Sequence, residues 1–182
     1  MARRCSTIVA AAALSGSLLA CAPSPTVREV SNKEVVLRFT DAVNSRDLEA
    51  LDELITENFV RQSQATPDVQ VENREQFKEY LRQNAETFPD EKIEIEQLVA
   101  EGDLVAFRGT YKGTQAGQMG PFPPSGEEME LEIAGMFRLE AGKLAELWIT
   151  WDNLAALAQL GHFPPKPEMD SDSIAAQERE DG

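Results

Sequence analysis

The spacing of apolar residues changes once along this chain, at Pro89, and the change limits the folds that it can adopt. From Val35 to Phe88, large apolar residues recur about every three to four positions, which indicates helices that bury one side. After Pro89 they alternate with charged residues, as at Ile93 and Ile95, which indicates strands. Helices followed by antiparallel strands predict an α+β fold in which the helices cover one face of a curved sheet.

Three helices are expected in the first half of the chain. The segment "SNKE" at 31–34 has the spacing of a capping box, so the first helix is expected to begin there. Asp47 is expected to cap a second helix, which leads into a strand that ends at Gln64. Asn73 is expected to cap the third, with a glutamine at its third position.

The last expected strand, 144–150, is apolar on both of its faces. Trp148 lies on one face by the alternation of the strand, and Trp151 lies on the other. A strand with two apolar faces needs a partner on each side. The helices, with any pocket that they enclose, would cover one face, and a second subunit in a homodimer would cover the other.

The first twenty residues, 1–20, are built like a signal peptide. Arg3 and Arg4 precede an apolar run at 8–19 that is too short to span a bilayer. The run ends in "LLAC", which resembles the lipobox of bacterial lipoproteins and gives Cys21 the place of the acylated cysteine. An ordinary secretory signal that is cleaved nearby is the alternative.

The remaining chain divides into three parts. Residues 21–30 are expected to hold the lipidated cysteine and a flexible tether, and residues 31–163 the folded domain. The tail at 164–182 is rich in proline and then acidic, which predicts disorder. An acylated Cys21 would anchor the protein in the cell envelope, on the periplasmic side of the outer membrane in a Gram-negative cell.

Composition excludes several classes of partner and cofactor. The chain has 32 acidic and 17 basic residues and a formal net charge of −15, so its surface repels phosphate backbones and nucleic acid is not expected as a partner. No metal or cofactor is expected either. Cys5 leaves with the signal peptide, Cys21 is consumed by lipid, and a single histidine, His162, cannot form a site of two or three histidines.

Four segments of the domain form a recognisable set through their order and spacing. They are "NSRDLEALDELITENFVRQSQ", "FPDEKIEIEQLVAEGDLVAFR", "GTQAGQMGPFPPSGEEMEL" and "FRLEAGKLAELWITWDNLAALAQLG". Together they resemble the SnoaL-like polyketide cyclase family, also called ester cyclases, within the nuclear-transport-factor-2-like superfamily. The resemblance implies a conical barrel in which a strongly curved antiparallel sheet packs on three helices and encloses a pocket.

The resemblance also implies a chemistry, the closure of a ring by an aldol condensation without metal or cofactor. An aspartate in the closing segment is the general acid and base of the family, and Asp152 stands at that position here. Three family histidines are replaced, by Gln62, Gln115 and Leu147. The two glutamines can hydrogen-bond a ligand but cannot titrate near neutral pH as histidine does, and leucine can do neither.

Other residues are candidate ligand contacts, each with a plain alternative. Trp148 and Phe122 would form an apolar wall that raises the pKa of Asp152; the alternatives are a core position for Trp148 and a rigid proline-containing turn for Phe122. Arg108 is either paired in the pocket or directed to solvent. Tyr111 either presents its hydroxyl to a ligand or packs in the sheet. Asp152 can also cap the helix that follows it.

Two functions therefore stay open. The first is an envelope-anchored SnoaL-like lipoprotein that binds a small, largely apolar ligand and performs cyclase, isomerase or hydrolase chemistry through Asp152. The second is a noncatalytic ligand-binding or accessory lipoprotein that retains only the fold. A purely structural dimer module is a third reading, which rests on the two-faced last strand. The sequence names no substrate.

Overall fold

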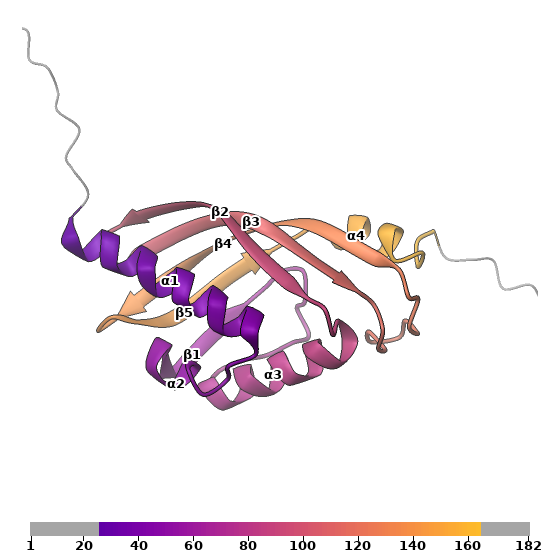
Figure 1. The fold of residues 1–182 in the computed structure, drawn as a ribbon, viewed down its shortest axis with the longest axis horizontal. Coiled ribbons are helices and arrows are strands. Elements are labelled where there is room, and N and C mark those ends of the chain that lie inside the picture. Colours follow the sequence, from indigo (N-terminus) through magenta and orange to yellow (C-terminus); the bar gives the residue numbers. More distant parts are fainter. Residues whose placement is uncertain (1–25, 165–182) are drawn as a thin grey trace, which may run out of the picture.

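The structure, a computed structural model, describes residues 26–164, and Figure 1 shows its helices packed against a single curved sheet. The helices are α1 (Val27–Ser45), α2 (Leu51–Leu54), α3 (Arg74–Thr87) and α4 (Asn153–Gln159). The strands are β1 (Ile55–Gln62), β2 (Lys92–Glu101), β3 (Leu104–Thr114), β4 (Glu128–Glu140) and β5 (Lys143–Thr150). The α+β class is confirmed. The signal peptide, Cys21 and nearly all of the acidic tail lie outside the described residues.

The sheet has five strands in the order β1-β5-β4-β3-β2. Neighbours from β2 to β5 are antiparallel, as expected. β1 pairs with β5 in parallel, with Arg61 opposite Leu147, so the sheet is mixed and not wholly antiparallel. The long stretch of chain between these two strands removes the constraint of a hairpin, which is what imposes antiparallel pairing on strands close in sequence.

Two glycines allow close contacts within the sheet. A Cβ atom on Gly135 of β4 would meet the carbonyl oxygen of Trp148 and lie 2.8 Å from the Phe107 ring. A Cβ atom on Gly109 of β3 would meet the carbonyl oxygen of Glu94, next to a shift of register in β2. Glycine within a strand marks such a close approach, and here it lets the strands curve around the space below them.

Aromatic rings hold the helices against the concave face of the sheet. Phe77 of α3 lies 4.9 Å from Phe59 of β1 and 5.8 Å from Phe39 of α1, measured between ring centroids. Phe39 in turn meets Phe137 of β4 edge to face at 5.4 Å. Such pairs contribute about 0.5–1.5 kcal/mol each beyond the burial of their area. These aromatic contacts therefore join α1 and α3 to β1 and β4.

The first helix begins earlier than the sequence predicted. Thr26 is the N-cap of α1 and forms a capping box with Glu29, so the predicted start at Ser31 is wrong and residues 27–30 belong to the helix and not to the tether. Both segments have the spacing of a capping box. The earlier one is used because Glu29 also accepts a hydrogen bond from the backbone N–H of Gly102, which ties the helix to the β2–β3 turn.

The structure also shows the residues predicted to cap the next two helices, Asp47 and Asn73. Asn73 caps α3 by accepting a hydrogen bond from the backbone N–H of Gln76 at 2.9 Å, which confirms that prediction. Asp47 does accept a hydrogen bond from the backbone N–H of Ala50, but the turn that it closes precedes α2. β1 ends at Gln62, two residues earlier than expected.

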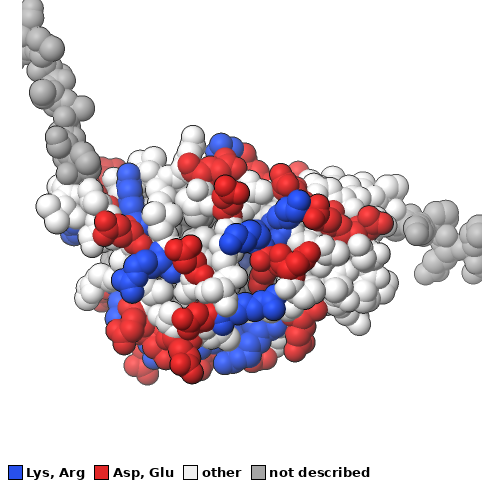
Figure 2. All heavy atoms as spheres, in the orientation of Figure 1, with Lys and Arg blue, Asp and Glu red and all other residues white. Residues whose placement is uncertain are grey.

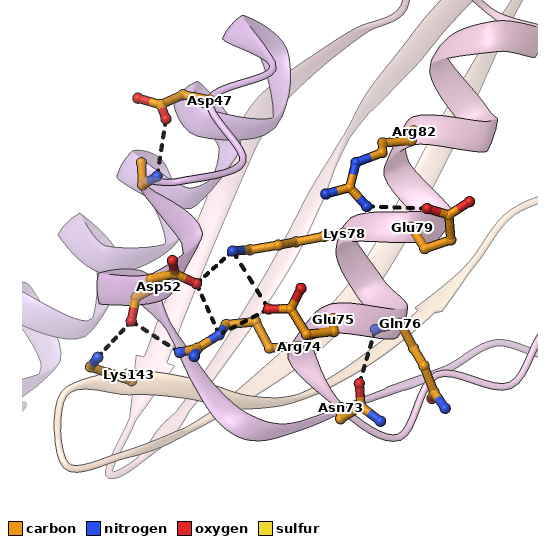
Figure 3. Close-up of polar contacts among 11 residues, drawn as sticks. Asp47, Asp52, Asn73, Arg74, Glu75, Gln76, Lys78, Glu79, Arg82 and Lys143 are labelled. Atoms are coloured by element: carbon orange, nitrogen blue, oxygen red, sulfur yellow. Dashed lines mark hydrogen bonds and ion pairs between the residues drawn. The ribbon is translucent and has the colours of Figure 1, made fainter.

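A polar network around Asp52 joins α2 to α3 and to the start of β5 (Figure 3). Its carboxylate lies 2.6 Å from Lys78 Nζ and 3.0 Å from Arg74 Nε, and its backbone carbonyl accepts a hydrogen bond from Lys143 Nζ. The hydrogen bond from Lys78 lowers the pKa of Asp52. Lys78 is only 7% exposed, so this buried cation has a carboxylate partner at the edge of the fold.

Charged side chains cover the outside of the domain. Figure 2 shows acidic and basic residues interspersed over one face. Examples of the ion pairs are Arg108 with Glu96 and Lys112 with Glu128, both on strands. Within residues 26–164, no helix combines the length and the apolar character needed to cross a membrane.

Candidate functional site

A cavity of about 940 Å³ lies between the concave face of the sheet and helices α1 and α3. Two loops border it, at 65–71 and 118–122. Its volume is typical of a site for a small molecule. Most of its wall is apolar, with Phe39, Val43, Phe107, Ile133, Phe137 and Ile149 among the lining residues.

Arg61 brings a positive charge to this wall. The alternation of β1 turns Phe59 and Arg61 toward the helices, and their exposed fractions are 0% and 4%. Arg61 donates a hydrogen bond from Nη1 to Thr66 Oγ1 at 3.1 Å and one from Nη2 to Tyr80 Oη at 3.3 Å. Its guanidinium carbon also lies 4.5 Å from the centroid of the Tyr80 ring and 5.8 Å from that of Trp151. These are cation–π distances.

A second polar group of the cavity is centred on the carboxyl group of Glu91. Tyr111 of β3 donates its hydroxyl to Glu91 Oε2 at 3.0 Å. Asn84 of α3 donates to the same carboxyl group and, at 3.1 Å, to Tyr111 Oη. Burial raises the pKa of Glu91 and also that of Tyr111. A buried carboxyl group with a raised pKa can both take and return a proton, which is what general acid–base catalysis requires.

Tyr80 is influenced by both of these polar groups. Burial raises the pKa of its hydroxyl, while the charge of Arg61 lowers it and that of Glu91 raises it. Both charged side chains therefore act on the same hydroxyl, although they do not form an ion pair with each other. The polar part of the cavity thus holds a cation, a carboxyl group and a tyrosine whose hydroxyl hydrogen-bonds the cation.

Two of the ligand-binding residues expected from the sequence line the cavity. Tyr111 does so through the hydroxyl described above, and Phe122 does so from the 118–122 loop. The ring of His162 stacks on Phe122 with 4.9 Å between centroids. This contact fixes the loop against the C-terminal end of the domain.

Gln115 is fully buried but is not among the residues that line the cavity. Its amide nitrogen donates to the carbonyl oxygens of Gly117 and Pro123, and its amide oxygen accepts from Ser125 and His162. The side chain is occupied by these four contacts. Its role in the structure is to hold the loop that carries Phe122, not to contact a ligand.

Three other expected ligand contacts lie on the opposite face of the sheet. Gln62 and Trp148 are register neighbours and border a shallow depression of about 250 Å³ there. Arg108 pairs with Glu96 and Glu132, which leaves it directed to solvent. Alternation separates the two faces of a strand but does not say which one the helices cover. The homodimer expected through the sheet stays a prediction.

Asp152 is placed as a helix cap and not as a cavity residue. Its Oδ1 accepts hydrogen bonds from the backbone N–H groups of Leu154 at 2.9 Å and Ala155 at 3.0 Å, and the residue is exposed. It is not among the residues that line the cavity. The expectation that its carboxylate works inside the pocket is therefore not met in this structure, and the alternative role as a cap is the one that the geometry shows.

Four polar cavity residues were not predicted from the sequence: Arg61, Tyr80, Asn84 and Glu91. The position of Arg61 could have been predicted, because it is two residues from the apolar Phe59 and therefore lies on the same face of β1. Glu91 follows directly after the break at Pro89, where it reads as an ordinary surface acid. Among residues 26–164, no group of three metal-binding side chains comes together.

Comparison with known proteins identifies a family and several similar structures. Residues 33–160 match the family of SnoaL-like polyketide cyclases. IdmH of Streptomyces antibioticus, a candidate polyketide cyclase, is 32% identical with a TM-score of 0.64, and the match covers 71% of this chain and 98% of IdmH. A candidate SnoaL-like polyketide cyclase of Jannaschia sp. CCS1 is 25% identical with a TM-score of 0.71, covering 79% of this chain and 100% of that one. TsrD of Streptomyces laurentii is 28% identical with a TM-score of 0.64, covering 72% and 96%. Among curated proteins, none matches the chain.

The role of Asp152 can be tested by two substitutions. Asp152→Ala removes both capping hydrogen bonds and is expected to lower the free energy of unfolding by about 1 kcal/mol. Asp152→Asn keeps an oxygen at the same position and is expected to change it much less, because asparagine caps about as well as aspartate. Urea denaturation measures both. A stable Asn variant that has lost ligand turnover would restore the catalytic role of Asp152.

The raised pKa of Glu91 predicts a pH dependence of stability. The carboxyl group of Glu91 binds its proton more tightly in the folded protein than in the unfolded chain, where glutamates titrate at about pH 4.3. The free energy of unfolding of wild type, relative to that of Glu91→Gln, should therefore be highest below that pH. It should fall as the pH rises through the raised pKa of Glu91. Urea denaturation of both proteins over a pH series tests this. A relative stability that grows with pH would contradict it.

Proposed function

Because the chain belongs to the SnoaL-like polyketide cyclase family, with the nuclear-transport-factor-2-like fold, we propose that its cavity binds a small, largely apolar molecule and that Glu91 acts on it as general acid and base. One observation carries this proposal. A cavity of about 940 Å³ with a mainly apolar wall holds a buried carboxyl group whose pKa burial raises. Apolar enclosure and a convergent titratable group are the usual features of a small-molecule site.

The chemistry needs a proton to leave a carbon atom next to a carbonyl group. The ionised carboxylate of Glu91 would take that proton, and the enolate carbon would then attack a second carbonyl and close a ring. The same carboxyl group would return the proton to the alkoxide that forms. The hydroxyl of Tyr80 accepts a hydrogen bond from Arg61 and keeps its own proton, which can stabilise the developing negative oxygen. Isomerase and hydrolase reactions begin with a similar proton transfer.

A second function, ligand binding without turnover, is favoured by the replaced histidines. Gln115 is occupied by the loop that it holds, and Leu147 is buried and adds only apolar surface to the cavity. Neither can replace an imidazole as a proton donor or acceptor. The two functions share the cavity and differ only in whether Glu91 transfers a proton.

We also propose that the domain is carried on a lipid anchor at Cys21 and faces the periplasm. The apolar run and the "LLAC" segment support this. α1 begins at Val27, so at most about 20 Å of extended chain would separate its first residue from the anchor. The domain would therefore sit close to the membrane surface, and its ligand would be a molecule present in the envelope.

Ligand capture tests the main proposal. Residues 22–182 are incubated with a metabolite extract, re-isolated and analysed by mass spectrometry for a bound molecule and its product. Glu91→Gln should retain capture within a few-fold and lose conversion by about 10²-fold or more, the usual effect of removing a general acid or base. Asp152→Asn is the matched control and should retain both.

The other outcomes of this experiment are also informative. Conversion that is unchanged in Glu91→Gln would contradict the assigned role of Glu91. Capture without conversion by wild type would establish the second function. Capture of nothing by wild type would contradict both functions.

The anchor is tested by the mass of the mature protein. The expected N-terminus is Cys21 carrying acyl chains, and Cys21→Ser should abolish the added mass and release the protein from membranes. An unmodified N-terminus at any other residue would contradict the proposal.

A further inference from the structure

Arg61 is a buried cation without a carboxylate partner. It is 4% exposed, and none of the ion pairs formed among residues 26–164 includes it. Its side-chain contacts are neutral: the hydroxyls of Thr66 and Tyr80 and the ring faces of Tyr80 and Trp151. These contacts orient the guanidinium group, but none cancels its charge.

Another buried cation of the same domain, Lys78, does have carboxylate partners. Lys78 is 7% exposed and lies 2.6 Å from the carboxylate of Asp52 and 3.7 Å from that of Glu75. The chain has 32 acidic residues, nearly twice its number of basic ones. A buried charge without a counter-charge lowers stability. A shortage of acidic residues therefore does not explain why Arg61 has no carboxylate partner.

The position of Arg61 in the wall of the cavity explains why it has no carboxylate partner within the protein. Arg61 is one of the residues that line the cavity, and its guanidinium group contacts two other lining residues, Thr66 and Tyr80. Guanidinium carries five N–H donors, and the two side-chain hydrogen bonds to Thr66 and Tyr80 use two of them. Donors and charge remain for a group that enters from the cavity.

We propose that the ligand of this cavity carries a carboxylate and that Arg61 binds it. Arginine pairs with a carboxylate through two parallel hydrogen bonds, which is stronger and more directional than a neutral contact. The apolar body of the ligand would then extend along the wall formed by residues such as Phe107 and Ile133. This inference rests on the proposed function and names its ligand class, small apolar monocarboxylic acids.

The other charged group of the cavity does not prevent this binding. Glu91 forms no ion pair with Arg61, and its carboxyl group is held by Tyr111 and Asn84. Burial raises the pKa of Glu91, so this carboxyl group carries a negative charge less readily than an exposed glutamate and repels a ligand carboxylate less.

The test uses two ligands of equal shape and different charge, octanoate and octanamide. The protein is the full chain with Cys21→Ser, which keeps lipid acyl groups out of the assay. Isothermal titration calorimetry at neutral pH should show octanoate binding about tenfold or more tightly than octanamide, as expected for charge-assisted hydrogen bonds. In Arg61→Gln this preference should disappear, while the affinity for octanamide should stay within about twofold of wild type.

Two further variants sharpen the comparison. Arg108→Gln removes an arginine from the opposite face of the sheet and should leave the preference unchanged. Trp148→Phe leaves Trp151 as the only tryptophan, 5.8 Å from the Arg61 guanidinium, so its fluorescence should change when octanoate binds. This signal locates binding inside the cavity.

The outcomes separate this inference from the proposed function. Equal affinity of wild type for the two ligands would overturn the inference and leave an apolar cavity that binds ligands. A preference that persists in Arg61→Gln would also overturn it, because Arg61 would then have only a structural role. Binding of neither ligand would overturn both. If Arg61→Gln does not fold, the comparison in wild type and in Arg61→Lys, which keeps the charge, still decides the matter.

Discussion

The contacts of Phe77 with Phe39 and Phe59 hold α1 and α3 against the concave face of the sheet, and the rest of the structure depends on them. They join two helices and a strand that no hairpin or short loop brings together. The cavity begins beside these rings, since Phe39 and Phe77 also line it. The size of the cavity and the side chains that face it therefore follow from where these three rings meet.

The cavity combines an apolar wall with two polar groups that have different environments. Arg61 is oriented by hydroxyls and rings and keeps its charge uncompensated. Glu91 is held by Tyr111 and Asn84, and burial favours its neutral form. A cation that fixes one end of a ligand, and a carboxyl group that exchanges a proton with another part of it, would divide binding and chemistry between them. This division accounts for a SnoaL-like site without the family histidines.

Local sequence signals predicted the elements well and the site poorly. The change of period at Pro89 and the cap at Asn73 depend on residues close in sequence, and these predictions agree with the structure. The inner face of a strand depends on which side the helices cover, which alternation cannot show. Trp148 and Gln62 were therefore expected as ligand contacts although they lie on the face away from the cavity, and Arg61 was not predicted. From the sequence, Asp152 fitted two roles, a helix cap and a catalytic carboxylate. Only its surroundings in the fold distinguish them.

The proposed functional site is the cavity between α3 and the sheet, and a crystal structure of the protein with its captured ligand tests that placement most directly. We predict electron density for the ligand inside the cavity, with an acidic group at Arg61 and a carbon atom within reach of Glu91. Density beside Trp148 and Gln62 on the opposite face, or against Asp152 with the cavity empty, would contradict it.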